Sequence, residues 1–182
     1  MCKRIVILEL LLLTAGALTL GHFRQNDYSI IFERIQIDRY NKEYLRTAKI
    51  VTFKYNRTQP ACNATFEVLK DFGNNLEVII QAYTFLSNEY RTFPMRFSLD
   101  LCKVIDANDF GLGDIVQEGL FSGCPIKKGV IHVYNWKPNQ SRFPPFIPNG
   151  QYKLEMEILY FSTEVFVMNA YGTVSRPLGR RH

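Results

Sequence analysis

The chain has 182 residues, a formal net charge of +5 and 47% hydrophobic residues. This length suits a single domain, the apolar content excludes a disordered chain, and the scattered Lys and Arg residues argue against a nucleic-acid-binding surface. Only three histidines are present, His22, His132 and His182, so a multi-histidine metal site is nearly excluded.

Residues 1–21 have the layout of a secretory signal peptide. Lys3 and Arg4 precede an apolar run from Ile5 to Leu20, and small residues are frequent near its end. The competing interpretation is an uncleaved membrane anchor. It is weaker because the run has 16 residues, fewer than the roughly 20 that a spanning helix needs. The sequence therefore predicts cleavage, a mature domain over residues 22–182, and a secreted protein that is not integral to the membrane.

Three sequons support an extracellular location. Asn56, Asn63 and Asn139 each begin an Asn-x-Ser/Thr sequence without a central proline. Such sequences are acceptors for N-glycosylation on the surface of secreted proteins. We therefore expect a glycoprotein that folds in an oxidising compartment.

Alternation of apolar and polar residues dominates the rest of the chain, and this period of two is typical of half-buried antiparallel strands. The predicted strands are residues 35–38, 51–55, 62–68, 76–83, 95–101 and 152–158, with weaker candidates at 129–135 and 163–168. About eight strands separated by turns predict an all-β antiparallel sandwich.

The connections between these strands carry turn residues. Residues 71–75, Asp-Phe-Gly-Asn-Asn, predict a hairpin between two strong strands. Residues 106–121 break the alternation, and Asp114 is a candidate cap for a short helical turn there. Residues 136–150 contain four of the eight prolines and predict a loop.

Three cysteines remain outside the predicted signal peptide. Cys102 ends a predicted strand, and a disulfide to Cys124 would close the irregular segment against the sheet. Cys62 shares the parity of Ala64 and Phe66, which favours a buried free thiol. Pairing of Cys62 with Cys102, with Cys124 or with another chain stays open.

Four landmarks carry a resemblance to a known family. They are Phe53-Lys54-Tyr55-Asn56-Arg57-Thr58, Asp100-Leu101-Cys102-Lys103, Cys124-Pro125 and Pro148-Asn149-Gly150-Gln151-Tyr152. In this order they resemble a large insect family of small secreted proteins, first catalogued as a domain of unknown function. That family is similar to the ML superfamily (myeloid-differentiation-type lipid recognition), and some insect members are chemosensory proteins.

The resemblance implies a fold and a kind of site. It implies an immunoglobulin-like β-sandwich with an apolar ligand cavity between the sheets, a Cys102–Cys124 disulfide and no catalytic motif. Alternation alone favours a filled core, whereas the resemblance favours a hollow one. The residues expected to line the cavity are Phe66, Val78, Ile80, Phe97, Leu99, Leu154, Met156 and Ile158. The residues expected at its rim are Phe110, Phe121, Phe143 and Phe146.

Enzymatic chemistry has little support in the sequence. No Gly-x-Ser-x-Gly elbow and no phosphate-binding loop is present. His132 lies within a predicted strand, where a surface or hydrogen-bonded histidine is commoner than a catalytic one. We therefore expect a non-enzyme, without cofactor or metal, that binds a lipid or other hydrophobic small molecule as a carrier or chemosensory protein. The alternative is a protein-recognition module that acts as an accessory ligand of an extracellular receptor.

Overall fold

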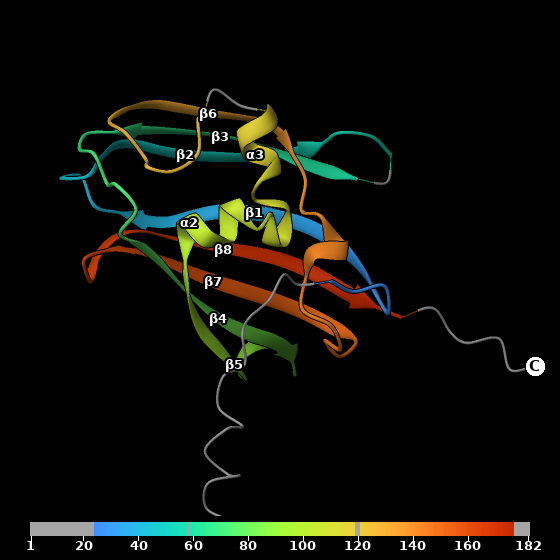
Figure 1. The fold of residues 1–182 in the computed structure, drawn as a ribbon. Helices are drawn as coiled ribbons and strands as arrows, with labels where there is room; N and C mark the ends of the chain where they lie inside the picture. Colours follow the sequence, from blue (N-terminus) through green and yellow to red (C-terminus); the bar gives the residue numbers. More distant parts are fainter. Residues whose placement is uncertain (1–23, 58, 119–120, 177–182) are drawn as a thin grey trace, which may run out of the picture.

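The computed structural model describes residues 24–57, 59–118 and 121–176, so the predicted signal peptide at 1–21 lies outside it. Two antiparallel sheets face each other (Figure 1), with strand orders β1-β8-β7-β4-β5 and β2-β3-β6. The strands are β1 (Ser29–Tyr40), β2 (Leu45–Lys54), β3 (Pro60–Val68), β4 (Leu76–Leu86), β5 (Glu89–Asp100), β6 (Gly129–Trp136), β7 (Gly150–Tyr160) and β8 (Thr163–Ser175). The prediction of an all-β, immunoglobulin-like antiparallel sandwich is confirmed.

The predicted hairpin at residues 71–75 is wrong. The strands on either side of it, β3 and β4, belong to different sheets, so this segment crosses from one sheet to the other. Phe72 is buried with 3% of its surface exposed, and its backbone N–H donates to the carbonyl oxygen of Ile126 at 3.0 Å. Gly73 adopts a φ of +60°, which is why a turn-like composition occurs here. Burial of Phe72 anchors the segment where it crosses between the sheets. The turn residues alone do not distinguish such a crossing from a hairpin.

The two sheets meet along one side, where β1 lies beside β2. The main-chain register of β1 against β8 shifts between Phe32 and Arg34, and again between Ile37 and Arg39. Next to the first shift, the backbone N–H of Ile35 donates to Thr52 Oγ1 at 3.0 Å, and this hydroxyl lies 3.3 Å from the carbonyl oxygen of Ile35. A single side chain of β2 thus satisfies both backbone groups of one β1 residue.

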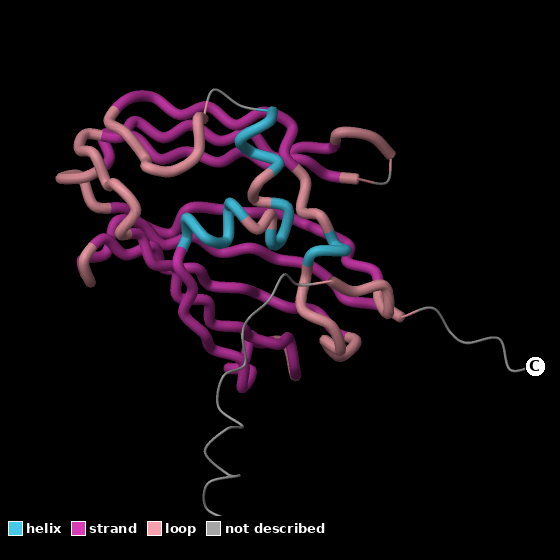
Figure 2. The backbone as a smooth tube through the Cα atoms, in the orientation of Figure 1, coloured by secondary structure: helices cyan, strands magenta, loops and turns pink. Residues whose placement is uncertain are grey.

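A helical segment lies at the other side of the sandwich, between β5 and β6. It comprises α2 (Leu101–Asp106), the 3₁₀ turn η1 (Asp109–Gly111) and α3 (Asp114–Glu118), drawn in cyan in Figure 2. Asp100 caps α2 by accepting from the backbone N–H of Lys103 at 3.0 Å. The predicted short helical turn is present, with Asp114 as its first residue and Asp114 Oδ1 accepting from Asn108 Nδ2 at 2.7 Å. Among the described helices, none is long and apolar enough to cross a membrane.

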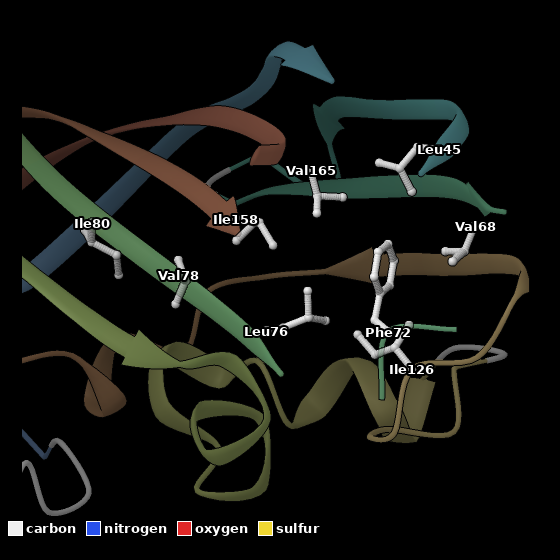
Figure 3. Packing of buried hydrophobic residues seen from close by; sticks show 9 residues of the cluster. All are labelled: Leu45, Val68, Phe72, Leu76, Val78, Ile80, Ile126, Ile158 and Val165. Atoms are coloured by element: carbon white, nitrogen blue, oxygen red, sulfur yellow. The ribbon is translucent and has the colours of Figure 1, made fainter. Parts of the chain in front are cut away.

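Buried apolar side chains pack together at one end of the sandwich. They come from both sheets and from the two links that cross that end (Figure 3). The cluster consists of Leu45, Val68, Phe72, Leu76, Val78, Ile80, Ile126, Ile158 and Val165. Leu45 and Val165 are almost completely buried, with 2% and 1% of their surfaces exposed. All nine side chains also border the free space between the sheets, so the buried core and the wall of that space are continuous.

Asn169 on β8 is a buried polar residue with an unsatisfied oxygen. It has 6% of its surface exposed, and its Oδ1 has no hydrogen-bond partner in the described part of the chain. It points to the outer face of the large sheet, since its neighbours Met168 and Ala170 line the inside. The rings of Tyr90 on β5 and Tyr171 on β8 are 5.6 Å apart, although β4 and β7 separate their strands. The β4–β5 hairpin therefore bends over this outer face.

Replacing Asn169 with valine is expected to stabilise the fold. The change removes an unpaired buried acceptor, which costs about 1–3 kcal/mol, and it introduces a residue that favours strands. We expect the free energy of unfolding to rise by about 1 kcal/mol, measured by urea denaturation. Asn169→Asp is the matched control and should destabilise, because it buries a charge. A less stable valine variant would show that the amide is needed.

Candidate ligand cavity

A cavity of about 290 Å³ lies between the two sheets. Its walls come from three sources: the inward face of the large sheet, the inward face of the small sheet, and the helical segment between β5 and β6. The sheets meet along β1 and β2, while at the opposite side α2 packs against β4 and β5 and α3 packs against β6. Because the helical segment occupies this side, the inward faces of the two sheets are held apart and border the space.

The structure brings nearly all of the predicted lining residues together on the cavity wall. Leu99 is the exception, because it packs against the buried cluster of Figure 3 without itself lining the cavity. Leu99 pairs with Val78 close to where β5 gives way to α2. The predicted residues on the wall are Phe66, Val78, Ile80, Phe97, Leu154, Met156 and Ile158.

The predicted rim residues divide into two groups. Phe110, Phe121 and Phe143 are among the lining residues, and the rings of Phe110 and Phe143 meet edge to face with centroids 5.0 Å apart. Phe146 does not line the cavity and has 80% of its surface exposed. Its backbone has a φ of +64° and its N–H donates to Asp27 Oδ2 at 3.3 Å, which fixes the loop with the phenyl ring outside.

Sequence reasoning missed the contribution of α2. Leu101, Val104 and Ile105 all line the cavity from this helix, although residues up to 101 were expected to form a strand. Their spacing of i, i+3 and i+4 is the signal for one apolar face of a helix. Asp100, immediately before this triplet, is the capping signal that completes the pattern.

The surface of the cavity is wholly apolar within the described residues. Those lining residues that carry polar side-chain atoms direct them to other partners. Trp136 Nε1 donates to the carbonyl oxygen of Gly111 at 2.8 Å, and the Tyr152 hydroxyl donates to that of Pro148 at 3.0 Å. The described residues contain no cluster of metal-binding side chains either. Whatever enters this space is held by apolar contact and shape.

The predicted disulfide between Cys102 and Cys124 is confirmed, with Cα atoms 5.7 Å apart. It ties the start of α2 to the chain that leads into β6. The prediction for Cys62 is also confirmed, because this thiol is free and buried. Cys62 Sγ lies 3.7 Å from the carbonyl oxygen of Trp136, at the cavity wall.

The Cys62 thiol makes the free energy of unfolding depend on pH in the alkaline range. Burial raises the pKa of its thiol from an ordinary 9.0 to about 12. Between these values the unfolded chain has lost the proton and the folded chain keeps it, so the free energy of unfolding falls as pH rises. From pH 8 to pH 10 we expect a loss of about 1.4 kcal/mol that Cys62→Ala does not show. Guanidinium denaturation of both proteins at the two pH values measures it, and equal losses would contradict the assignment.

The three sequon asparagines occupy different surroundings. Asn56 is exposed after β2, but Thr58 of its sequon lies outside the described residues. Asn63 is exposed on β3, the central strand of the small sheet. Asn139 is half-buried and caps the 3₁₀ turn η2 (Gln140–Arg142), where its Oδ1 accepts from both the backbone N–H and the hydroxyl of Ser141.

The fold and the site define a β-sandwich with an apolar cavity between its sheets. A family model described as "Protein of unknown function (DUF1091)" matches residues 75–154. This match agrees with the family resemblance predicted from the sequence landmarks, and it spans β4, β5, the helical segment, β6 and the start of β7. No curated protein matches the chain.

Two solved structures show a distant likeness. One is chicken MD-1 complexed with lipid IVa, at 14% identity and a TM-score of 0.35, with 85% of this chain and 94% of that chain covered. The other is a Niemann-Pick type C2 protein from the Japanese carpenter ant, at 13% identity and a TM-score of 0.29, with 84% of this chain and 97% of that chain covered. These TM-scores are too low to transfer a ligand or a function to the present chain.

Proposed function

We propose that this protein binds a lipid or another hydrophobic small molecule in the cavity between its sheets. The observation that carries the proposal is a cavity of about 290 Å³ between the sheets whose surface is wholly apolar. An empty apolar space of this size costs packing energy, because the atoms around it lose van der Waals partners. A bound apolar molecule restores those contacts and leaves water at the same time.

The lining defines the chemistry of the buried part of the ligand. A buried hydroxyl or carbonyl without a partner costs about 1–3 kcal/mol, and the cavity surface presents no polar atom to pair with one. Each buried methylene group contributes about 0.8 kcal/mol of affinity. The geometry therefore favours an alkyl chain or a compact hydrocarbon skeleton, with any polar head group outside the cavity.

The volume sets the scale of the ligand. A dry engineered cavity of about 150 Å³ holds one benzene molecule. The present cavity is about 290 Å³, which is close to twice that space. Fatty acids, long-chain alkanes, alcohols or esters with part of the chain enclosed fit this scale better than a large multi-chain lipid does.

A secreted, extracellular role accompanies this proposal. Support comes from the signal-peptide pattern at residues 1–21 and the three sequons. A disulfide joining Cys102 to Cys124 adds to it, since such bonds persist mainly in oxidising compartments. The resemblance to an insect family with some chemosensory members extends the proposal to a carrier that delivers its ligand in chemosensory tissue.

Ligand displacement tests the proposal directly. The full chain, secreted from eukaryotic cells, is purified and its co-purifying lipids are identified by native mass spectrometry. A fluorescent fatty-acid probe is then displaced by alkanes, fatty acids and sterols in turn. We expect saturable binding that strengthens with chain length until the cavity is full. The proposal would be refuted if no lipid co-purified and no class of compound displaced the probe.

A second candidate function is recognition of an extracellular receptor. The observation that favours it is Phe146, which is 80% exposed on a loop fixed by Asp27. In this case Phe146→Ala would abolish receptor binding and leave probe displacement unchanged. Under the lipid-binding proposal, Phe146→Ala leaves ligand affinity intact as well, so only a receptor-binding assay separates the two.

A further inference from the structure

The outer face of the small sheet carries exposed apolar side chains. Val51 on β2 and Tyr134 on β6 have 46% and 47% of their surfaces exposed, and Tyr55, just beyond β2, has 50%. Monomeric soluble proteins rarely expose contiguous apolar patches larger than a few hundred Å². The ring of Tyr134 stacks on that of His132 with centroids 5.8 Å apart, so the aromatic surface here is broad.

Asn63 lies at the centre of this face. It is the direct cross-strand partner of Val51, and its Oδ1 accepts a hydrogen bond from the backbone N–H of Asn135 at 2.8 Å. Asn135 is the residue after Tyr134, so Asn63 is flanked by apolar side chains on both neighbouring strands. The bond through Oδ1 leaves Nδ2, the atom that receives an N-linked glycan, as the free end of an exposed side chain.

In the folded protein, Asn139 is a poorer site for glycan attachment than Asn63. Its Oδ1 accepts twice from Ser141 as the cap of η2, and its backbone N–H donates to the carbonyl oxygen of Phe110 at 3.1 Å. A Cβ built on Gly111 would lie only 2.7 Å from Asn139 Cβ, so the surroundings of Asn139 are crowded. The open strand face around Asn63 has room for a bulky substituent.

We propose that Asn63 carries an N-linked glycan and that this glycan covers the apolar outer face of β2, β3 and β6. The sugar donor is an oligosaccharide linked to a lipid pyrophosphate, supplied with its transferase by the secretory pathway. Nδ2 of Asn63 bonds to the anomeric carbon, the carbon–oxygen bond to the pyrophosphate breaks with its electron pair, and the amide loses one proton. A glycan is bulky and strongly hydrated. It therefore shields Val51 and Tyr134 from other molecules.

This inference rests on the secretion part of the proposed function and is independent of ligand binding. The test uses the full chain secreted from eukaryotic cells, once with its own first 21 residues and once with a cleavable leader from an unrelated secreted protein in their place. Enzymatic deglycosylation in ¹⁸O-labelled water converts each glycosylated Asn into labelled Asp. Mass spectrometry of the peptides then gives the occupancy of Asn63.

The expected result is labelled Asp at position 63 in most of the secreted molecules. Asn63→Gln removes the attachment residue and Thr65→Val removes the sequon hydroxyl. Each variant should lose the mass of one glycan. Thr65→Ser is the matched control, which keeps both the sequon and a hydroxyl facing His132, and it should keep the glycan. Unlabelled Asn63, or a Thr65→Val protein of unchanged glycan mass, would overturn the proposal.

The covering role has its own readout. Protein deglycosylated under native conditions should self-associate in sedimentation velocity and bind more hydrophobic dye than the glycosylated protein. Replacing Val51 with Thr and Tyr134 with Ser should reverse both effects. Unchanged sedimentation and dye binding after deglycosylation would refute the covering role. A glycan that forms only with the unrelated leader would refute secretion by residues 1–21, but it would still support the Asn63 site. Displacement of the fluorescent probe tests ligand binding separately.

Discussion

Replacing Ala170 with tryptophan is expected to weaken ligand binding about 100-fold. Ala170 lies on β8 and lines the cavity between Leu154 of β7 and Ile35 of β1. An indole ring at this position occupies space that the ligand would fill. If it excludes about four methylene groups at roughly 0.8 kcal/mol each, the loss is about 3 kcal/mol, which corresponds to about two orders of magnitude in affinity.

A graded series makes this prediction specific. Ala170→Val, Ala170→Leu and Ala170→Trp should lower affinity in that order, measured by displacement of the fluorescent fatty-acid probe. Ile79→Trp is the matched control, because Ile79 lies on β4 but does not line the cavity. We expect the control to bind as the natural protein does. Unchanged affinity in a folded Ala170→Trp protein, checked by circular dichroism, would mean that the ligand binds elsewhere.

Removing the disulfide is expected to lower the free energy of unfolding by about 3 kcal/mol. Cys102 and Cys124 are separated by 22 positions, and cross-linking a loop of this size restricts the unfolded chain by roughly that amount. The loop contains the helical segment and Phe121, all of which contribute to the cavity wall. Loosening it should therefore weaken ligand binding in addition to stability.

The double variant Cys102→Ala/Cys124→Ala is measured by guanidinium denaturation. Cys62→Ala is the control for cysteine removal, because it leaves the disulfide intact. Adding a reducing agent should shift the unfolding midpoint of the natural protein towards that of the double variant and should leave the double variant unaffected. A loss below about 1 kcal/mol would show that native packing, and not the cross-link, fixes this segment.

Strands were predictable where one face is buried without interruption. The alternation in β4 and β7 continues along the paired register of the two strands, and the side chains of one parity face inward throughout. In β1 only four residues could be identified from the sequence, although the strand has 12. The register shifts near Glu33 and Asp38 change which parity faces inward. A pattern that depends on constant parity therefore detects only the stretch between the two shifts.

The cavity itself was not predictable from alternation. Alternation identifies Phe66 and Met156 as inward-facing, but the distance between the sheets depends on what separates them at their open side. That separation comes from the segment that follows Asp100, whose apolar residues follow a helical period instead of a strand period. Likewise, the turn residues around Gly73 predict a reversal of the chain and not the sheet to which the next strand belongs.

The contact between β1 and β2, which joins the two sheets along one side, affects how ligand specificity can change. Thr52 and the neighbouring strands fix the sheets on one side only, while a helical segment held by one disulfide spans the other. Substitutions or length changes in that segment can alter the depth and width of the binding space while every strand pairing stays in place. A set of such proteins could therefore diversify its ligands by varying one short stretch of chain, as antibodies diversify their loops upon a constant framework.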